Sequence, residues 1–215
     1  MSRPPVIRRE DLLKTALTLF RKNGVDHTTV SDIVKEAHVA QGTFYNYFRS
    51  KDDIFAAVLE AVTKHTLEEI QKTADRNDIG PVEKLNLLTQ QDFRMNRQND
   101  SLFDVLHESQ YAYVHQKYIV GRIQALHPIY EKLIRQGVDE GYCNTPYPKE
   151  AALYLLTATK FVFDPAFFAF SEEEMIEMAQ AVSDFSERIL GAKHDPLRQQ
   201  DWNQNIQHYF GGDIK

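Results

Sequence analysis

The sequence predicts an all-α protein. Apolar residues recur at helical spacing along most of the 215 residues, and no segment shows the alternation of a half-buried strand. Hydrophobic residues make up 42% of the chain, which is enough for a proper core, and only 9 Gly and 8 Pro interrupt it. We therefore expect an all-α fold with a small N-terminal three-helix domain, of the helix-turn-helix type, followed by a larger helical domain.

The first predicted helix spans roughly residues 8 to 23. Leu13, Ala16 and Leu17 share one face of it, and Phe20 extends that face by one turn. Gly24 follows and is the expected terminator, because glycine readily adopts the left-handed conformation that ends many helices.

Two short amphipathic helices come next, joined by a tight turn at residues 37–39. Thr29 and Asp32 have the spacing of a capping box, which opens the first of these helices. Its predicted buried stripe consists of Val30, Ile33, Val34 and Ala37. The second helix, at about residues 40 to 47, carries amide, hydroxyl and phenol groups. Such groups suit the base edges and phosphates of a DNA major groove.

A longer helix begins at Lys51 and runs to about residue 74, with Ser50 and Asp53 as a second capping box. The clearest break in the chain comes at residues 77–81, where Pro81 suits the first turn of a new helix. Five further helices are predicted near residues 81–97, 101–108, 110–140, 149–163 and 172–190. Pro128 is expected to kink or split the longest of them.

These elements divide the chain into a helix-turn-helix domain at residues 1–55, a linking helix at 51–76 and a second helical domain at 77–191. Residues 192–215 form a C-terminal extension. Helical spacing within the extension is seen at Trp202, Ile206 and Tyr209. We expect a short helix there that docks on the second domain; a disordered tail is the alternative.

Charge is unevenly distributed along the chain. The formal net charge of −6 argues by itself against nucleic acid as a partner. Residues 1–55 nevertheless carry 9 Lys and Arg against 7 Asp and Glu, a net +2, whereas the remainder carries 16 against 24, a net −8. We therefore expect the N-terminal end to face any DNA that the protein binds.

Composition disfavours several classes of protein. No apolar run approaches the roughly 20 residues of a membrane span, so no membrane contact is expected. The first residues have no apolar stretch after their arginines, so we expect no secretory signal. Cys143 is the single cysteine, which leaves no internal disulfide framework. These features fit a cytoplasmic protein.

Residues 20–53 resemble the TetR family of one-component transcriptional repressors. The resemblance rests on Phe20-Arg-Lys-Asn-Gly24, Thr28-Thr29-Val30, Asp32-Ile33-Val34, Ala37, Val39, Gly42-Thr43-Phe44-Tyr45, Tyr47-Phe48 and Ser50-Lys51-Asp52-Asp53. Two positions depart from the family pattern. His38 replaces the usual turn glycine, although histidine tolerates a positive φ better than most residues. Ala40 stands where a serine often caps the second helix, so that helix is expected to depend on packing.

The resemblance implies which residues read DNA. Gln41 corresponds to a position that reads a base, Ser31 to one that touches the edge of the DNA, and Lys51 to a phosphate clamp. The tyrosines and Thr43 correspond to positions that bind phosphates or thymine methyl groups. The complete set implied to bind DNA is Thr29, Ser31, Gln41, Gly42, Thr43, Tyr45, Tyr47 and Lys51.

The second half of the chain shows no catalytic constellation, so no catalytic residue is predicted. Its histidines, at 107, 115 and 127, lack the spacing of a zinc site, and we expect neither a metal nor a cofactor. An unusual number of aromatic residues lies there, some of which are expected to line an effector cavity. The candidates for effector binding are Phe93, Phe103, His107, Tyr111 and Phe161. Because no cluster of cations is apparent, we expect an apolar or aromatic effector.

The resulting hypothesis is a ligand-responsive, DNA-binding transcriptional regulator, a repressor that its effector releases from the operator. The implied partners are double-stranded operator DNA, a small-molecule effector and a second copy of the chain. In the homodimer, the helices near 149–163 and 172–190 would form the interface, helped by small residues such as Ala151, Ala152 and Ala158. One alternative is a DNA-binding regulator controlled by a protein partner. A helical enzyme with a borrowed helix-turn-helix is the other, and the missing catalytic groups speak against it.

Overall fold

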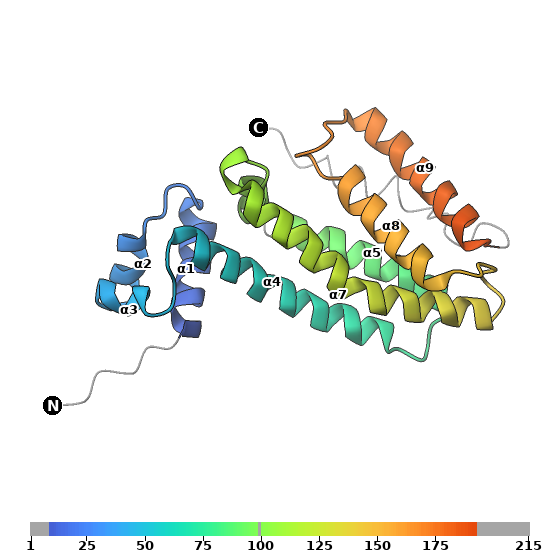
Figure 1. Ribbon diagram of the computed structural model, residues 1–215, viewed down its shortest axis with the longest axis horizontal. Helices are drawn as coiled ribbons and strands as arrows, with labels where there is room; N and C mark the ends of the chain where they lie inside the picture. Colours follow the sequence, from blue (N-terminus) through green and yellow to red (C-terminus); the bar gives the residue numbers. More distant parts are fainter. Residues whose placement is uncertain (1–8, 99, 193–215) are drawn as a thin grey trace. The chain divides into compact units, whose positions relative to one another are not determined.

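The computed structural model describes residues 9–98 and 100–192, apart from the side chains of residues 93–101 and 172. Within these ranges the chain forms nine α-helices and one 3-10 helix and contains no strand (Figure 1). This confirms the all-α prediction. The expected helix around Trp202 lies outside the described residues.

The helices follow the predicted order, with bounds that differ by a few residues. The α-helices are α1 (Arg9–Asn23), α2 (Val30–Glu36), α3 (Gln41–Tyr45), α4 (Lys51–Ala74), α5 (Pro81–Gln98), α6 (Asp100–Leu106), α7 (Ala112–Asp139), α8 (Pro148–Val162) and α9 (Glu172–Leu190). The 3-10 helix η1 (Ser109–Tyr111) comes just before α7. No helix among the described residues is long and apolar enough to cross a membrane.

The chain packs as two compact units. The first unit joins residues 1–65 to residues 98–118, and the second joins 66–97 to 119–215. Both α4 and α7 therefore contribute residues to each unit. This division differs from the domain boundaries predicted above, which stay a prediction.

In the first unit, the buried face of α1 agrees only in part with the prediction. Leu12 and Leu19 are buried together with Ala16 and Phe20, whereas the predicted Leu13 is only half-buried. Ala16 and Phe20 were predicted correctly, but Leu12 and Leu19 are buried in place of Leu13 and Leu17, because α1 must pack against both α2 and α6. Phe20 meets Phe55 of α4 edge-on, with ring centroids 5.7 Å apart.

The helix-turn-helix forms as the sequence predicts. The capping box of α2 is complete: Thr29 and Asp32 each accept a hydrogen bond from the other's backbone N–H. His38 adopts a φ of 55°, as expected for a turn position usually held by glycine. Ala40 offers no side-chain cap to α3, which is only five residues long. Packing therefore holds α3 in place, through fully buried Phe44.

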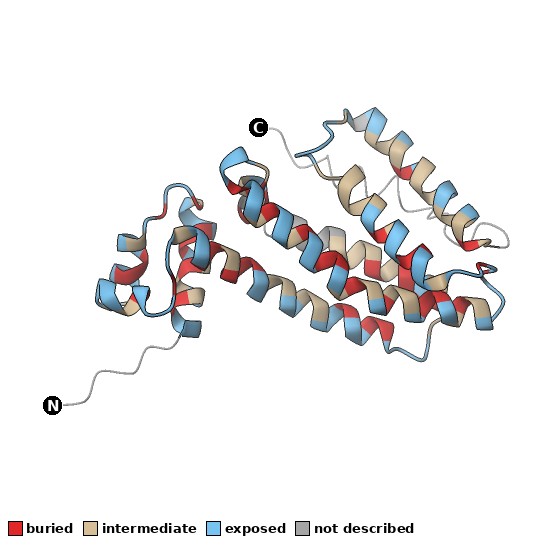
Figure 2. Cartoon of the chain, in the orientation of Figure 1, coloured by how far each residue is buried: buried red, intermediate tan, exposed pale blue. Residues whose placement is uncertain are grey.

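The start of α4 departs slightly from the predicted capping box. The backbone N–H of Asp53 donates to Ser50 Oγ at 3.1 Å, as expected. The Asp53 carboxylate, however, accepts from the N–H of Arg49 at 2.9 Å, one residue before the predicted partner. The first two turns of α4 then bury Ile54 and Phe55 in the first unit (Figure 2).

The second unit is built from the remaining part of α4 with α5, α7, α8 and α9. Pro128 lies inside α7, which continues through it as one helix, so the proline splits nothing. Its core includes Leu88 of α5 and Leu126 and Leu133 of α7, which are almost fully buried. A capping box between Ser171 and Glu174 opens α9.

Candidate nucleic-acid interface and sensor core

The α3 helix has one buried side and one exposed side. On the buried side, Phe44 is inaccessible and its ring lies 5.7 Å from that of Phe48. On the other side Gln41 is exposed, and Tyr45 and Tyr47 keep 53% and 41% of their surface accessible. α3 thus presents an amide and one phenol, and the turn after it presents the second phenol of Tyr47, while Phe44 and Phe48 anchor the segment.

Two further residues implied to bind DNA differ in how exposed they are. Ser31 is exposed on the first turn of α2, and Thr43 is half-buried in α3. At Gly42, a Cβ would meet no atom within 4 Å. The backbone of α3 is therefore open to close approach at this position.

The Thr29 hydroxyl takes part in the capping of α2. It donates to Asp32 Oδ2 at 2.7 Å and accepts from the backbone N–H of Asp32. The Asp32 carboxylate accepts from both the hydroxyl and the backbone N–H of Thr29, and these two bonds lower the pKa of the Asp32 carboxyl because they stabilise its ionised form. Thr29 therefore has a structural role at the helix start that the sequence pattern had also predicted.

The Lys51 ammonium is bound within the protein. Its Nζ donates to the backbone carbonyl of Val25 at 3.0 Å and to that of Asp26 at 3.4 Å. Lys51 is half-buried and sits on the first turn of α4. It thus ties α4 to the loop that follows α1, a role that sequence reasoning missed, because no local pattern signals a contact across 26 residues.

Three of the effector candidates lie in the first unit. Phe103 is buried, with its ring 5.3 Å from that of Tyr118. Tyr111 is also buried, and its ring meets that of Phe55 at a centroid distance of 5.3 Å. Burial raises the pKa of the Tyr111 phenol, and its hydrogen bond to an aspartate raises it further.

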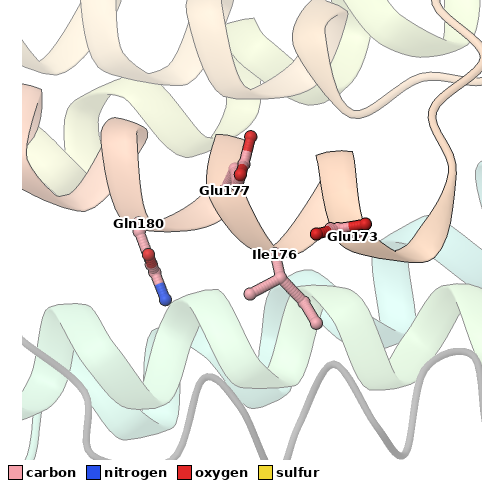
Figure 3. Close-up of a pocket in the computed structure, with 4 residues that line it drawn as sticks. All are labelled: Glu173, Ile176, Glu177 and Gln180. Atoms are coloured by element: carbon pink, nitrogen blue, oxygen red, sulfur yellow. The ribbon is translucent and has the colours of Figure 1, made fainter.

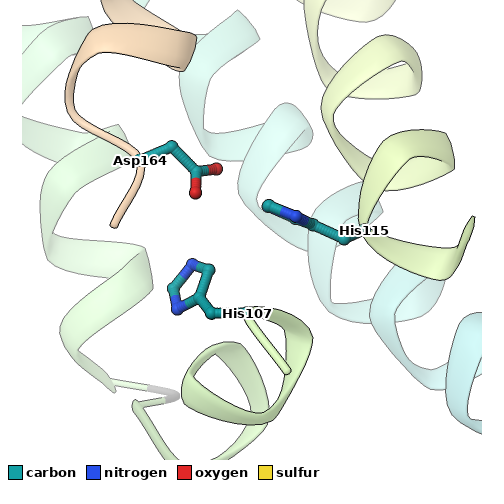
Figure 4. Close-up of side chains that lie close together, drawn as sticks. All are labelled: His107, His115 and Asp164. Carbon is teal, nitrogen blue, oxygen red and sulfur yellow. The ribbon is translucent and has the colours of Figure 1, made fainter. Parts of the chain in front are cut away.

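The third candidate in this unit, His107, is paired with a second histidine. The rings of His107 and His115 lie edge to face, with centroids 5.3 Å apart (Figure 4). His115 is buried and His107 half-buried. Asp164, also drawn in Figure 4, belongs to the second unit. Two histidines within one unit fall short of the ligand sets that hold a zinc ion.

The remaining two candidates belong to the second unit. Phe161 is half-buried near the end of α8, and its ring lies 5.0 Å from that of Phe167. Phe93 is part of α5, but its side chain is outside the described residues. The candidates are therefore divided between the two units, and no single cavity can be built from all of them within one unit.

A buried ionic cluster in the second unit contradicts the expectation that this region has no group of cations. Asp92 of α5 accepts hydrogen bonds from Arg122 of α7 at 3.1 and 2.6 Å, and it also forms an ion pair with Lys160 of α8. The Arg122 side chain is fully buried, and those of Asp92 and Lys160 are 14% and 17% exposed. Burial alone would raise the pKa of Asp92, but Lys160 and Arg122 outweigh it and lower the pKa to about 2.

A pattern in the sequence does signal this cluster. Arg122 interrupts an otherwise apolar stripe of α7, with buried Ile119 before it and buried Ile123 and Leu126 after it. A charged residue inside such a stripe is seldom buried unless it is paired. The partners, however, lie 30 and 38 residues away along the chain, beyond the reach of helical periodicity.

A shallow surface hollow lies on α9. Glu173, Ile176, Glu177 and Gln180 line it, all from one helix (Figure 3). Three of these side chains are exposed and two are acidic. Ligand sites are mostly enclosed and apolar, so we do not assign the effector to this hollow.

Two family models match the chain. Residues 12–58 match the model for bacterial regulatory proteins of the tetR family. Residues 94–188 match a tetracyclin repressor-like C-terminal domain. The chain belongs to the TetR family. The first match covers α1, α2, α3 and the start of α4, and the second covers α6 through α8 and most of α9.

Curated relatives match this TetR-family chain over only part of its length. The HTH-type transcriptional regulator YvdT of Bacillus subtilis is 44% identical over 62 residues, 29% of this chain and 32% of that protein. The HTH-type transcriptional repressor KstR2 of Mycolicibacterium smegmatis is 35% identical over 81 residues, 38% of this chain and 39% of that protein. The matched stretch thus spans only about a third of the length of these relatives.

Solved structures of TetR-type proteins share the fold over most of the chain. A TetR/AcrR-family regulator from Thermobifida fusca has a TM-score of 0.57 at 22% identity, covering 87% of this chain and 99% of its own. SmeT in complex with triclosan has a TM-score of 0.58 at 21% identity and covers 87% and 93%. FadR from Bacillus subtilis in complex with stearoyl-CoA has a TM-score of 0.52 at 18% identity and covers 87% and 100%.

Proposed function

We propose that this TetR-family chain is a homodimeric repressor, which leaves its operator when a small molecule binds the larger helical domain. The observation that carries the proposal is the exposed side of α3. There Gln41 and Tyr45 project from a helix that buried Phe44 holds in place. Polar side chains on a rigid short helix are suited to reading base edges in a major groove.

The roles proposed for the DNA-binding residues follow from the exposure of their side chains. The Gln41 amide would bond to an adenine edge, which it fits with two hydrogen bonds. Lys51 would hold a phosphate, for which its Nζ must leave or share the carbonyls of Val25 and Asp26. Contacts to backbone phosphates or sugars are proposed for the remaining set: Thr29, Ser31, Gly42, Thr43, Tyr45 and Tyr47.

The dimer is proposed from exposed apolar side chains on α8 and α9. These two helices pack against each other. Leu153 and Tyr154 of α8 are 46% and 63% exposed, and Phe185 of α9 is 55% exposed. Large apolar side chains gathered on neighbouring helices favour a protein interface over solvent. A second copy of the same face, meeting it across a twofold axis, would bury them.

The proposed switch uses the helices that contribute to both units. The sequence drew attention to α4 alone, but α7 also contributes residues to each unit. A ligand that enters the second unit would displace packing around the far half of α4. In a dimer this would change the distance between the two α3 helices, which operator half-sites hold at a fixed spacing. The relatives bound to triclosan and stearoyl-CoA support an effector with a large apolar part.

DNA reading is tested by selecting operator sequences from randomised duplexes and titrating them by fluorescence anisotropy. Gln41→Ala should cost roughly 1–3 kcal/mol at one base position and relax the preference there. Gln116→Ala, at an exposed position of α7, is the matched control and should bind like the parent. If no duplex is enriched, or if Gln41→Ala keeps the base preference of the parent at every position, the proposed DNA-binding role of α3 is wrong.

Control by a small molecule is tested by the reciprocity of binding. Bound operator must weaken the affinity for the effector by the same factor by which the effector weakens operator binding. Calorimetric titrations of a candidate effector, with and without operator, measure this factor directly. Equal affinities in the two titrations would exclude the switch and would favour the alternative of a protein partner.

A further inference from the structure

The ionic cluster in the second unit carries one more positive charge than negative. Asp92 is the only carboxylate that pairs with Arg122 and Lys160 among the described residues. Two cations and one ionised carboxylate leave a net charge of +1 in a place where the Arg122 side chain has no exposed surface. An unbalanced charge is costly to bury, so the cluster favours a further anion.

Arg122 also has unused hydrogen-bonding capacity. Its Nε and Nη2 donate to Asp92, but its buried Nη1 has no hydrogen-bond partner in the described part of the chain. A guanidinium offers five N–H donors in a planar fork, which pairs well with a carboxylate. The free edge of Arg122 is therefore available to an acceptor that the described part of the chain does not supply.

A buried leucine adjoins the cluster on each of its three helices, and the Tyr130 phenol of α7 also lies near Asp92 and Arg122. One helical turn from Asp92, Arg122 and Lys160 lie Leu88, Leu126 and Leu156, which are 0%, 1% and 4% exposed. Residues four apart on a helix lie on the same face. A layer of leucines thus adjoins the charged layer. This combination suits a molecule with an anionic end and an apolar body.

We propose that Arg122 and Lys160 form the recognition site for the carboxylate of an amphipathic monoanion, such as an aliphatic or arylaliphatic acid. The proposal deepens the proposed function and rests on it, because it names the chemical class of the effector. One negative charge neutralises the cluster, which favours a carboxylate over a dianion. The expected apolar or aromatic effector gains an anionic end that the sequence did not lead us to expect.

The test compares acids with alcohols of the same carbon skeleton. Decanoate and phenylbutyrate, below their micellar concentrations, should raise the melting temperature of the full chain by several degrees, because each binds only the native state. Decanol and phenylbutanol should raise it much less. If neither acid protects the protein better than its alcohol, the inference is overturned.

Single substitutions locate the site without leaving an unpaired charge. Arg122→Met leaves the pair Asp92–Lys160, and Lys160→Met leaves Asp92–Arg122, so both variants keep a neutral cluster. Each should weaken acid binding about tenfold or more. Lys132→Met removes an exposed cation of α7 that pairs with Asp75, and it should leave acid binding unchanged. If Lys132→Met weakened acid binding as much as the other two substitutions do, the loss would be a nonspecific charge effect. The assignment of the site to Arg122 and Lys160 would then be overturned.

A third variant predicts a change in the opposite direction. Asp92→Asn removes the negative charge and leaves both cations unpaired, so acids should bind it more tightly than they bind the parent and should protect it more. Weaker acid binding by Asp92→Asn would contradict the proposed site. This result is independent of whether the two methionine variants fold.

Operator release, measured in parallel, separates this inference from the proposed function. If the alcohols release operator DNA as well as the acids do, the repressor proposal stands and the carboxylate site is wrong. If the acids bind through Arg122 but leave operator affinity unchanged, the site stands and the proposed switch is wrong.

Discussion

The Tyr111 hydroxyl donates a hydrogen bond of 2.9 Å to Asp26 Oδ1, across 85 residues of sequence. Gln110 Nε2 donates to the same oxygen at 3.1 Å. Both donors belong to η1, and Asp26 lies in the loop between α1 and α2. Within the first unit, the segment just before α7 is therefore bonded directly to the loop that leads into the helix-turn-helix. Lys51 binds the backbone of that loop as well. The loop between α1 and α2 is therefore hydrogen-bonded to both η1 and α4.

Replacing Tyr111 by Phe should destabilise the protein. The substitution keeps the ring against Phe55 but removes a hydrogen bond to an ionised carboxylate, which is worth roughly 1.5–3 kcal/mol. Urea denaturation of the parent and the variant would measure the loss. The matched control is Tyr113→Phe, because Tyr113 is 70% exposed and its change should stay within about 0.5 kcal/mol. Equal effects of the two substitutions would show that the bond to Asp26 contributes nothing.

Local features of this fold could be predicted from the sequence. The capping boxes at Thr29 and Ser171, the positive φ of His38 and the helix that begins at Lys51 all depend on residues within a few positions of each other. Helical periodicity located every α-helix to within a few residues. Such features need no knowledge of which helices pack together.

Features that depend on distant contacts could not be predicted in this way. Two of the four buried positions of α1 were assigned wrongly, Leu13 and Leu17 in place of Leu12 and Leu19, because the neighbours of the helix were unknown. The bond from Lys51 to Val25 and the cluster around Asp92 each join residues more than 20 positions apart. Periodicity shows that Arg122 lies on a buried face, but it does not show what pairs with it.

Lys51 should contribute to both stability and DNA binding. Lys51→Ala removes its bonds to the carbonyls of Val25 and Asp26, at a cost of about 1 kcal/mol in the free energy of unfolding. It should also weaken binding to all DNA sequences alike and reduce the salt dependence by about one phosphate contact. Urea denaturation and anisotropy titrations at several salt concentrations measure the two effects. Lys64→Ala, at an exposed position of α4, is the control for both.

If Lys51→Ala lowered stability but left the salt dependence of binding unchanged, Lys51 would be purely structural. Its proposed contact with a phosphate would then be wrong, whereas the contact of α4 with the loop after α1 would stand.

Phe185 should be required for the proposed dimer. Phe185→Glu places a charge on the apolar face of α9, and burying an unpaired charge in an interface is strongly unfavourable. The variant should be a monomer at micromolar concentration by light scattering, and it should bind the operator much more weakly than the parent does. Phe185→Leu keeps an apolar side chain and should remain a dimer. A stable monomer of the parent protein under the same conditions would contradict the interface.

Asp92 should make the free energy of unfolding depend on pH. Its pKa in the folded chain is lowered to about 2 from an ordinary 3.8. A lowered pKa means that the folded state holds the proton less tightly than the unfolded chain does. The stabilisation is therefore complete above the unfolded pKa and is lost as the pH falls toward 2. The amount at stake is on the order of 2 kcal/mol.

Comparing the parent with Asp92→Asn between pH 7 and pH 3 isolates this contribution. At neutral pH the variant leaves two cations without their carboxylate, which should cost roughly 3–5 kcal/mol. As the pH falls below the unfolded pKa of 3.8, the unfolded parent takes up a proton that the folded parent still excludes. The parent therefore loses stability, and the difference in the free energy of unfolding should shrink. Asp78→Asn is the control: the pKa of Asp78 is also about 2 beside Arg76, but the pair is exposed and solvent screens it. A gap for Asp92→Asn that stays constant with pH would mean that the cluster does not hold Asp92 ionised, and it would remove the charge balance on which the proposed carboxylate site depends.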